Sequence, residues 1–583
     1  MLRLLYGLFV NSLILIFFPL YAWRRKRACP ERAWLKFEID GAVVEFAPRL
    51  PFWRREKRPF ALQALRKLID VSDGDPRVAG LLIEIERLHC GSATATDLRE
   101  LLLVAKRKQL RVVVYLPSGG GTRELYVASA ADQILLGPET DVTALGFAIE
   151  APYLRRALDR AGVHAEVFAR GAYKTAGEPL QLEHMSEPQR EQLGLLLDTA
   201  WDVLVEALTS GRKLGREAVE RFIDEGPWPA QGAVDHGIAD AVVYPDALAK
   251  HLDPRSKDGA PLFRGELYLR RRQIRWRRLP RPRIGVVEVH GPIVSEARGP
   301  MPVASEEAVC EALQQAIDDR TVRGVVLHVD SRGGSALASD RMLYAARRLA
   351  EKKPVVAFLA DSAASGGYMV AVGAHKIVAQ PTTVTGSIGV VAARVVVGPL
   401  LERLGVAVEV VKRGARADMH SPARGLGDAE RAVIERQLEH VYKGFVAAVA
   451  LGRNREFAEI DALAGGRIWS GRDAQVRGLV DRLGGFDLAL GELKEMLGPG
   501  AEALEPALIG ARRLRPSALG LPRFVSELRT LLSGTGAGAS FFDALVALTP
   551  VPGALRDLAA LCLGRGERAF LWSSISEIDL GDR

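Results

Sequence analysis

With 583 residues, the chain is too long for a single hydrophobic core and is expected to contain two or three domains. It is 48% hydrophobic and 26% charged, which is typical of soluble globular structure, and its net charge of +8 gathers in two arginine-rich runs, Arg24–Arg27 and residues 270–283. Neither run carries a nucleic-acid-binding signature, so no nucleic-acid partner is expected. The four cysteines show no CxxC or Cys/His spacing, so neither a metal site nor a disulfide framework is predicted, and no cofactor is expected (Cys29, Cys90, Cys310 and Cys562).

In chain order, the first feature is an uncharged run from Leu4 to Trp23, followed at once by Arg24–Arg27. A run of about 20 apolar residues matches the core of a bilayer. We therefore expect an uncleaved, single-pass membrane anchor within residues 1–30. Under the positive-inside rule, the flanking charge favours a cytoplasmic location for the rest of the chain.

The sequence is a weak tandem duplication with an offset of about 243 residues. Ala64–Asp70 resembles Ala312–Asp318, and Arg111–Leu116 matches Pro354–Leu359. Later landmarks keep the register: Pro138 falls on Pro381, Gly146 on Gly389 and Gly171 on Gly414. The period is far too long for a solenoid, so the duplicated unit is a whole domain.

Each copy has the pattern helix, apolar strand, helix, apolar strand, which predicts parallel βαβ units and an α/β fold. In the second copy we expect a strand at 324–330, a helix at 337–351 and a strand at 354–360. The expected domains are the anchor and its basic flank (1–30), a first copy (31–269), a basic linker (270–283), a second copy (284–490) and an extension of unknown role (491–583).

Ser365 is a candidate nucleophile because it follows a predicted strand and precedes Gly366–Gly367 at the start of a helical stretch. A serine on such a turn is exposed at the strand end, beside the N–H groups of a helix N-terminus. Gly333–Gly334 end the preceding strand and could supply the other oxyanion donor. Taken singly, each glycine pair could equally be an ordinary strand-to-helix turn.

A serine hydroxyl needs a base to remove its proton. The histidines around the second copy offer no obvious one, because none has an evident orienting acid (His290, His328, His375 and His420). The alternative base is a lysine that burial keeps neutral, since desolvation lowers a lysine pKa.

Three motifs carry a family resemblance. They are Ala363-Ala-Ser-Gly-Gly-Tyr368, Thr385-Gly-Ser-Ile-Gly389 and Tyr173-Lys-Thr-Ala-Gly-Glu-Pro179. Their order resembles that of the long, duplicated members of the S49 peptidase family, the signal peptide peptidases. The resemblance implies tandem ClpP/crotonase-like domains built from ββα spiral units.

The same resemblance implies a serine endopeptidase whose Ser/Lys dyad is split between the copies. Ser365 would be the nucleophile and Lys174 the general base and acid. The N–H groups of Gly366 and Gly334 would form the oxyanion hole, supported by Gly333 and Gly367.

The repeat register tests this assignment. Ser365 falls on Thr122 of the first copy, and Lys174 falls on Ala417 of the second. Each copy alone is therefore chemically incomplete, and one dyad per chain is expected. Ser387, whose counterpart is Ala144, could orient Lys174 by a hydrogen bond.

By resemblance, the substrates would be cleaved signal peptides and other short apolar peptides, and the chain would form a homo-oligomer, a tetramer. Residues 4–23 would anchor it in a bacterial inner membrane, with the catalytic part in the periplasm, against the indication of the flanking charge. One departure is Arg332, which stands where the family usually has proline before the oxyanion glycines. Two alternatives stay open: a crotonase-like acyl-CoA enzyme, and a noncatalytic membrane scaffold on a degenerate peptidase fold.

Overall fold

The computed structural model describes residues 12, 16–19, 29–47, 59–272, 281–297, 302–510 and 570–572. Most of the expected anchor, Leu4–Trp23, lies outside these residues, as does most of the 491–583 extension. In the described part, none of the helices combines the length and the apolar character needed to cross a membrane. The anchor therefore stays a prediction, and so do the predicted domain boundaries.

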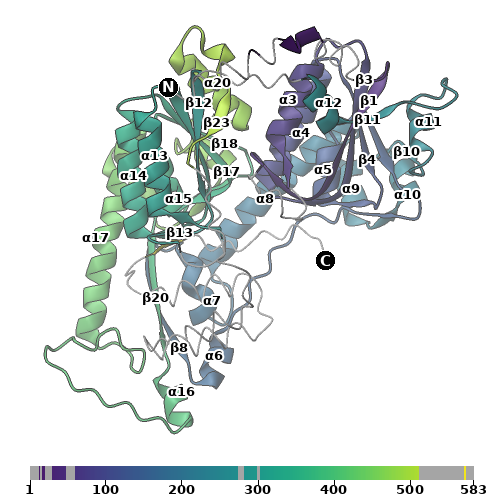
Figure 1. The fold of residues 1–583 in the computed structure, drawn as a ribbon. Helices are drawn as coiled ribbons and strands as arrows, with labels where there is room; N and C mark the ends of the chain where they lie inside the picture. The colour runs from purple at the N-terminus through teal and green to yellow at the C-terminus, as the bar shows by residue number, and fades with distance from the viewer. Residues whose placement is uncertain are drawn as a thin grey trace.

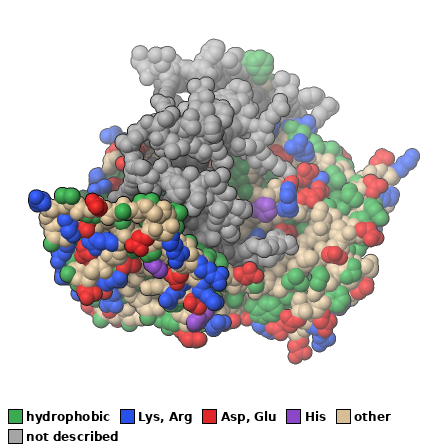
Figure 2. Space-filling view, turned by 90° about the horizontal axis from the view of Figure 1, so that it is seen from below, with side chains coloured by type: hydrophobic (Ala, Val, Ile, Leu, Met, Phe, Trp, Pro, Cys, Tyr) green, Lys and Arg blue, Asp and Glu red, His purple; other side chains and the backbone are tan. Residues whose placement is uncertain are grey.

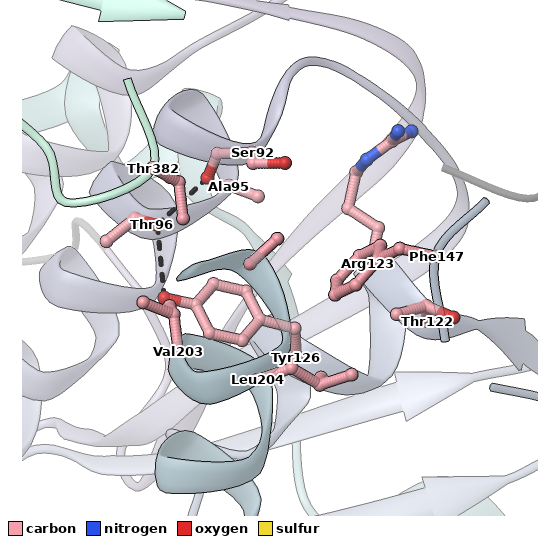
Figure 3. Close-up of a pocket in the computed structure, with 11 residues that line it drawn as sticks. Ser92, Ala95, Thr96, Thr122, Arg123, Tyr126, Phe147, Val203, Leu204 and Thr382 are labelled. Atoms are coloured by element: carbon pink, nitrogen blue, oxygen red, sulfur yellow. Dashed lines mark hydrogen bonds between the residues drawn. The ribbon is translucent and has the colours of Figure 1, made fainter. Parts of the chain in front are cut away.

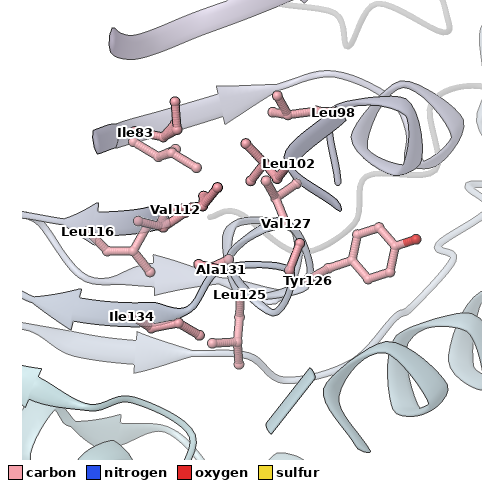
Figure 4. Packing of buried hydrophobic residues seen from close by; sticks show 14 of the residues in the cluster. Ile83, Leu98, Leu102, Val112, Leu116, Leu125, Tyr126, Val127, Ala131 and Ile134 are labelled. Atoms are coloured by element: carbon pink, nitrogen blue, oxygen red, sulfur yellow. The ribbon is translucent and has the colours of Figure 1, made fainter. Parts of the chain in front are cut away.

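The first half is built on a seven-stranded sheet with the strand order β10-β6-β4-β3-β1-β11, and β2 pairs with β1. Its strands are parallel and rich in buried aliphatic residues, as expected for a sheet covered on both faces. Figure 4 shows Val112 of the sheet near Leu102 of one covering helix, and Ile134 of the sheet near Leu125 of another. The strands are β1 (Ala33–Val44), β2 (Phe60–Ala61), β3 (Val78–His89), β4 (Arg111–Leu116), β5 (Gly120–Gly121), β6 (Gln133–Leu136), β7 (Asp141–Thr143), β8 (His164–Arg170), β9 (Trp228–Pro229), β10 (Ala241–Val242) and β11 (Leu262–Arg264).

The helices of this half cover the sheet or extend from it. They are α3 (Leu62–Ser72), α4 (Ser92–Arg107), α5 (Thr122–Ala128), α6 (Arg155–Ala161), α7 (Glu178–Gln181), α8 (Glu187–Arg212), α9 (Arg216–Asp224), α10 (Ala230–Asp235), α11 (Leu248–Leu252) and α12 (Gly265–Arg272). Figure 1 shows α6, α7 and β8 extending from this half below the second half.

The second half repeats the arrangement in an eight-stranded sheet. Its strands β22, β18, β17, β15, β12 and β23 correspond in order to β10, β6, β4, β3, β1 and β11. The strands are β12 (Arg283–His290), β13 (Ile293–Val294), β14 (Ala304–Ser305), β15 (Val322–Ser331), β16 (Gly333–Ser335), β17 (Val355–Ala364), β18 (Lys376–Ala379), β19 (Val384–Gly386), β20 (Val390–Val396), β21 (Ile468–Ser470), β22 (Arg482–Leu483), β23 (Pro506–Leu508) and β24 (Phe570–Trp572). The helices are α13 (Glu306–Asp318), α14 (Ala336–Ala350), α15 (Gly366–Ala371), α16 (Gly398–Arg403), α17 (Asp428–Arg453), α18 (Phe457–Leu463), α19 (Gly471–Val476) and α20 (Phe486–Leu497).

A third sheet joins the halves in the order β14-β13-β16-β24-β20-β8. Strand β8 of the first half pairs antiparallel with β20 of the second along its whole length. Strand β24 lies between β16 and β20 and pairs antiparallel with both. Through β8, this sheet joins the first half to the second (Figure 1).

The duplicated α/β architecture predicted from the sequence is confirmed. The strand expected at 324–330 is β15, the helix expected at 337–351 is α14, and the strand expected at 354–360 is β17, which continues to Ala364. One detail differs: Gly333–Gly334 do not end β15 but begin the separate strand β16. Their φ angles of 100° and 151° turn the chain out of the main sheet, which residues with a Cβ rarely allow.

Candidate active site

Ser365 lies at the turn between β17 and α15, and its side chain is fully buried. Its backbone angles are φ 54° and ψ −117°, an uncommon conformation for a residue with a side chain. Two hydrogen bonds hold it there: its N–H donates to the Gly386 carbonyl (2.8 Å), and its carbonyl accepts from Met369 N–H (2.9 Å). The turn thus fixes the backbone of Ser365.

Lys174 comes from the first half, just after β8, and 4% of its surface is exposed. Its Nζ lies 2.8 Å from Ser365 Oγ, 2.9 Å from Ser387 Oγ and 3.1 Å from the Ser387 carbonyl oxygen. The three side chains singled out in the sequence therefore meet at one point. They belong to one chain, so the Ser365–Lys174 contact forms within a protomer.

Burial lowers the pKa of Lys174 well below its ordinary value of 10.5, and desolvation is the cause. Among the described residues, no carboxylate forms an ion pair with this amine. A neutral amine has two N–H groups and one lone pair. Donation of both N–H groups to the two Ser387 oxygens leaves the lone pair facing the Ser365 hydroxyl.

Lys174 is seated by a glycine pair of the second half that sequence reasoning did not single out. Tyr173 N–H donates to the Gly465 carbonyl (2.9 Å). A Cβ placed on Gly466 would lie 2.5 Å from Lys174 Cβ, so this position has no room for a side chain. The adjacent pair Gly465–Gly466 was the available signal, but its partner is nearly 300 residues away in the sequence.

Gln192 of α8 is a second support that the sequence did not reveal. Its buried side-chain amide donates to the Tyr173 carbonyl (3.3 Å) and to Thr175 Oγ1 (2.8 Å), on either side of Lys174. Its amide oxygen accepts from Ile468 N–H (3.3 Å) of the second half. One side chain thus fixes the lysine segment against β21.

The glycines predicted as oxyanion donors pack against each other. A Cβ placed on Gly366 would lie 3.2 Å from Gly333 Cα and 3.4 Å from Gly334 N, and one on Gly367 would lie 2.4 Å from the Ser331 carbonyl oxygen. The N–H of Gly366 opens α15, where first-turn amides have no acceptor within the helix. The N-terminus of α15 and the β16 turn therefore converge beside Ser365.

Comparison with known proteins decides the family. Residues 104–257 and 347–498, about half of the chain, match the family model "Peptidase family S49". The chain belongs to peptidase family S49. The two matched segments fall one in each half, as the duplication requires.

Three relatives of this S49 chain span much of its length. The chloroplastic serine protease SPPA of Arabidopsis thaliana is 31% identical over 433 residues, covering 72% of this chain and 63% of its own. Protease 4 of Salmonella typhi is 31% identical over 388 residues, covering 64% and 62%. Protease 4 of Haemophilus influenzae is 28% identical over 444 residues, covering 74% and 72%. The chain thus spans a little less than two thirds of the Arabidopsis and Salmonella relatives.

In the first half of this S49 chain, the position that corresponds to Ser365 lines a small pocket (Figure 3). This pocket holds neither a serine nucleophile at that position nor a lysine. Thr122 replaces the serine, and its hydroxyl donates to the Gly146 carbonyl (3.2 Å). Tyr126 reaches across to Thr96, with their oxygens 3.0 Å apart. The pocket is lined by Ser92, Ala95, Thr96, Thr122, Arg123, Tyr126, Phe147, Ala200, Val203, Leu204 and Thr382, none of which is a lysine.

Three of the four histidines that the sequence analysis set aside make structural contacts. His290 Nε2 and His328 Nδ1 lie 2.7 Å apart, and His328 packs edge-on against Phe358. His375 Nδ1 accepts from Val355 N–H (3.1 Å).

On the outer surface, Figure 2 shows acidic and basic side chains interspersed over the described part of one face, the pattern of a solvated protein surface.

Proposed function

We propose that this chain is a serine endopeptidase that uses Ser365 and Lys174 as its catalytic dyad. The observation that carries the proposal is the 2.8 Å distance between the buried Lys174 amine, which forms no ion pair among the described residues, and the hydroxyl of Ser365, whose backbone is in a strained conformation. Burial lowers the pKa of Lys174, so its amine loses the proton at a lower pH than a solvated lysine does and can then act as a general base. The membership of the chain in a peptidase family supports the same reaction class.

In this mechanism Lys174 Nζ takes the proton of the Ser365 hydroxyl as Oγ attacks the scissile carbonyl carbon. The N–H groups of Gly366 and Gly334 donate to the oxyanion that forms. Lys174 then returns the proton to the leaving amine, and the peptide C–N bond breaks. A water molecule, deprotonated by the same amine, hydrolyses the acyl-enzyme and regenerates Ser365. Ser387 orients Nζ throughout.

The substrate is proposed to bind as an extended strand between β16 and β20. Strand β24 lies in this position and pairs with Gly333–Ser335 on one side and with Val391 on the other. A peptide in the same place would gain backbone hydrogen bonds by β-strand addition, next to the oxyanion glycines. Short apolar peptides, among them cleaved signal peptides, are the substrate class that the family resemblance suggests.

The remaining features follow from the resemblance and stay part of the proposal. The two halves would be ClpP/crotonase-like units. Residues 4–23 would anchor the chain in a bacterial inner membrane, with the catalytic part in the periplasm, and copies would assemble into a homo-oligomer, a tetramer.

The test uses purified full-length chain, a fluorogenic peptide and a labelled fluorophosphonate probe. Wild-type protein should hydrolyse the peptide and take up the probe on Ser365, and Ser365→Ala should do neither. Circular dichroism and gel filtration check that Ser365→Ala keeps the fold. Wild-type protein without hydrolysis or labelling would overturn the proposal in favour of a scaffold, and turnover of an acyl-CoA thioester instead would favour a crotonase-like enzyme.

A further inference from the structure

Arg467 follows the Gly465–Gly466 pair that seats Lys174, and its backbone reaches another support of the dyad. Its carbonyl oxygen accepts from Ser387 N–H (2.7 Å). Ser387 in turn accepts from Lys174 Nζ through its hydroxyl (2.9 Å) and its carbonyl oxygen (3.1 Å). The arginine therefore lies between the segment that carries the lysine and the residue that orients the amine.

The side chain of Arg467 contacts Tyr173, the residue directly before Lys174. Its guanidinium carbon lies 4.4 Å from the centre of the Tyr173 ring and 4.7 Å from the centre of a Trp469 ring. A guanidinium over an aromatic face is attracted by the ring quadrupole, and the attraction grows where water is excluded. Only 19% of the Arg467 side chain is exposed, so this contact is largely shielded from solvent.

Glu191 of α8 completes the contact from the first half. Its carboxylate accepts from Tyr173 Oη (2.7 Å) and from an N–H of Arg467. These two hydrogen bonds lower the pKa of Glu191, so the carboxylate stays charged. The ring, the guanidinium and the carboxylate thus form a triangle in which each group contacts the other two. We call this triangle the tyrosine clamp.

The first half, which carries no dyad, has no arginine at the corresponding place. Trp228 of β9 holds the ladder position of Trp469 of β21, since their partners in β7 and β19 are 243 residues apart. The residue two places before Trp228 is Gly226, where the second half has Arg467. Trp228 stacks on Phe222 instead. The arginine therefore belongs to the half with the proposed nucleophile and is not a requirement of the shared fold.

We propose that Arg467 is a positioning residue for the dyad. Its side chain clamps Tyr173 together with Glu191, and its carbonyl holds Ser387. The lysine between these contacts is thereby kept within hydrogen-bond distance of Ser365. A planar guanidinium can stack on a ring and donate to a carboxylate at the same time, which an ammonium group does less well. The inference rests on the proposed function and deepens it, because it names what holds the general base in place.

Loss of the tyrosine clamp should loosen the lysine segment and admit water to the amine. Water stabilises the charged form, so the amine would keep its proton to a higher pH. A displacement of about 1 Å can lower turnover by about a hundredfold. Strands β16 and β20, where substrate is proposed to bind, are not part of the clamp, so KM should change little. Lower kcat, a displaced pH profile and an unchanged KM are therefore the expected signature.

Arg467→Gln tests this signature in hydrolysis of the fluorogenic peptide by the full-length chain. We expect kcat to fall by about ten- to a hundredfold with KM within about twofold of wild type. The midpoint of the pH profile of kcat/KM should rise by about one pH unit. Arg467→Lys, which keeps the charge without the plane, should recover part of both. Arg477→Gln is the matched control, because Arg477 stacks on Trp469 (3.9 Å) and pairs with Asp473, outside the lysine segment. Its profile should match wild type.

Glu191→Gln approaches the tyrosine clamp from the first half. This side chain is 48% exposed, so the substitution should leave the fold intact. It should move the pH midpoint in the same direction as Arg467→Gln, and by less. The double variant should be little worse than Arg467→Gln alone, because both substitutions remove one shared contact. Circular dichroism checks that all variants are folded.

The outcomes separate this inference from the proposed function. A wild type that hydrolyses no peptide at any pH would contradict the proposed function, and the inference with it. An active wild type whose pH midpoint Arg467→Gln leaves unmoved would contradict the inference alone. So would equal midpoint shifts in Arg467→Gln and Arg477→Gln, or a loss of kcat by the same factor at every pH, which is the mark of a merely structural role.

Discussion

The two halves of the chain carry the same order of parallel strands, and they differ at the positions where chemistry would occur. In the second half the turn after β17 holds Ser365, which is followed by Gly366 and Gly367. In the first half the corresponding turn before α5 holds Thr122, which donates to a backbone carbonyl. The buried aliphatic strands are alike in both. Apolar periodicity has thus preserved the scaffold, while a few polar positions determine which half carries the proposed nucleophile.

A second difference concerns α4, which follows β3 in the first half, and its counterpart α14, which follows β15 and β16 in the second. Helix α14 is capped by its own Ser335, whose Oγ accepts from Ala338 N–H (3.2 Å). Helix α4 has Gly91 at this place, and Asp361 of the other half supplies the cap: its carboxylate accepts from Thr94 N–H (2.9 Å) and Gly91 N–H (3.2 Å). This cap therefore links the first half to the second at Asp361, four residues before Ser365.

The difference between the halves predicts that substitutions in the proposed dyad cause the largest loss of activity. Ser365→Ala and Lys174→Ala should each lower kcat/KM by at least about a thousandfold, as when a nucleophile or its base is removed. Because both groups act within one chain, mixing the two inactive variants should restore no hydrolysis. Recovery of a substantial fraction of wild-type activity in the mixture would show that copies exchange β8.

The pH dependence should report Lys174. Its amine acts when neutral, so kcat/KM should rise by more than tenfold with pH, through the lowered pKa of Lys174, and level off well below pH 10.5. Stability should also rise with pH. In the unfolded chain Lys174 keeps its proton up to about pH 10.5, whereas in the folded chain it loses the proton at a lower pH. The free energy of unfolding should therefore increase as pH rises from the folded pKa of Lys174 towards 10.5. A rate that climbs only around pH 10.5 would mean that the amine is not desolvated in solution.

Strand β24 predicts a smaller effect on substrate binding. A truncated variant that ends at residue 510 lacks β24, so the backbone groups of β16 and β20 that pair with β24 become available to an extended peptide. KM for such a peptide should therefore fall by about two- to fivefold, with kcat unchanged. Full-length Leu571→Pro is the matched variant, since it removes one N–H from the same ladder. Unchanged KM in both would show that β24 does not compete with substrate.

The smallest effect on turnover is expected at the contact between α4 and Asp361. Gly91→Ala places a Cβ 2.2 Å from Asp361 Cγ and should lower the free energy of unfolding by about 2 kcal/mol. Hydrolysis by the folded fraction should change little. Gly194→Ala in α8 is the control, because nothing lies within 4 Å of its Cβ. Thermal unfolding of both variants checks the difference. Equal melting temperatures would show that the contact between α4 and Asp361 does not stabilise the fold.

Much of this was accessible from the sequence because the repeat and the motifs are local patterns. The register alone paired Ser365 with Thr122 and left Lys174 without a counterpart lysine. What it could not supply were contacts between distant segments: the seat that Gly465–Gly466 form for Lys174, and the cap that Asp361 gives to α4. Such contacts depend on how two folded halves dock, and neither periodicity nor turn composition encodes that.

The seat of Lys174 also sets the point during synthesis at which the proposed dyad can be completed. Proteins fold from the N-terminus as they are synthesised, so the lysine leaves the ribosome long before the serine and before the glycine pair at 465–466 that holds it. Until those glycines are made, the amine stays in water, charged and without a nucleophile to activate. Under the proposed mechanism, a chain made in this order has no complete dyad while it is being translated, so it cannot cleave its own nascent chain or that of a neighbour.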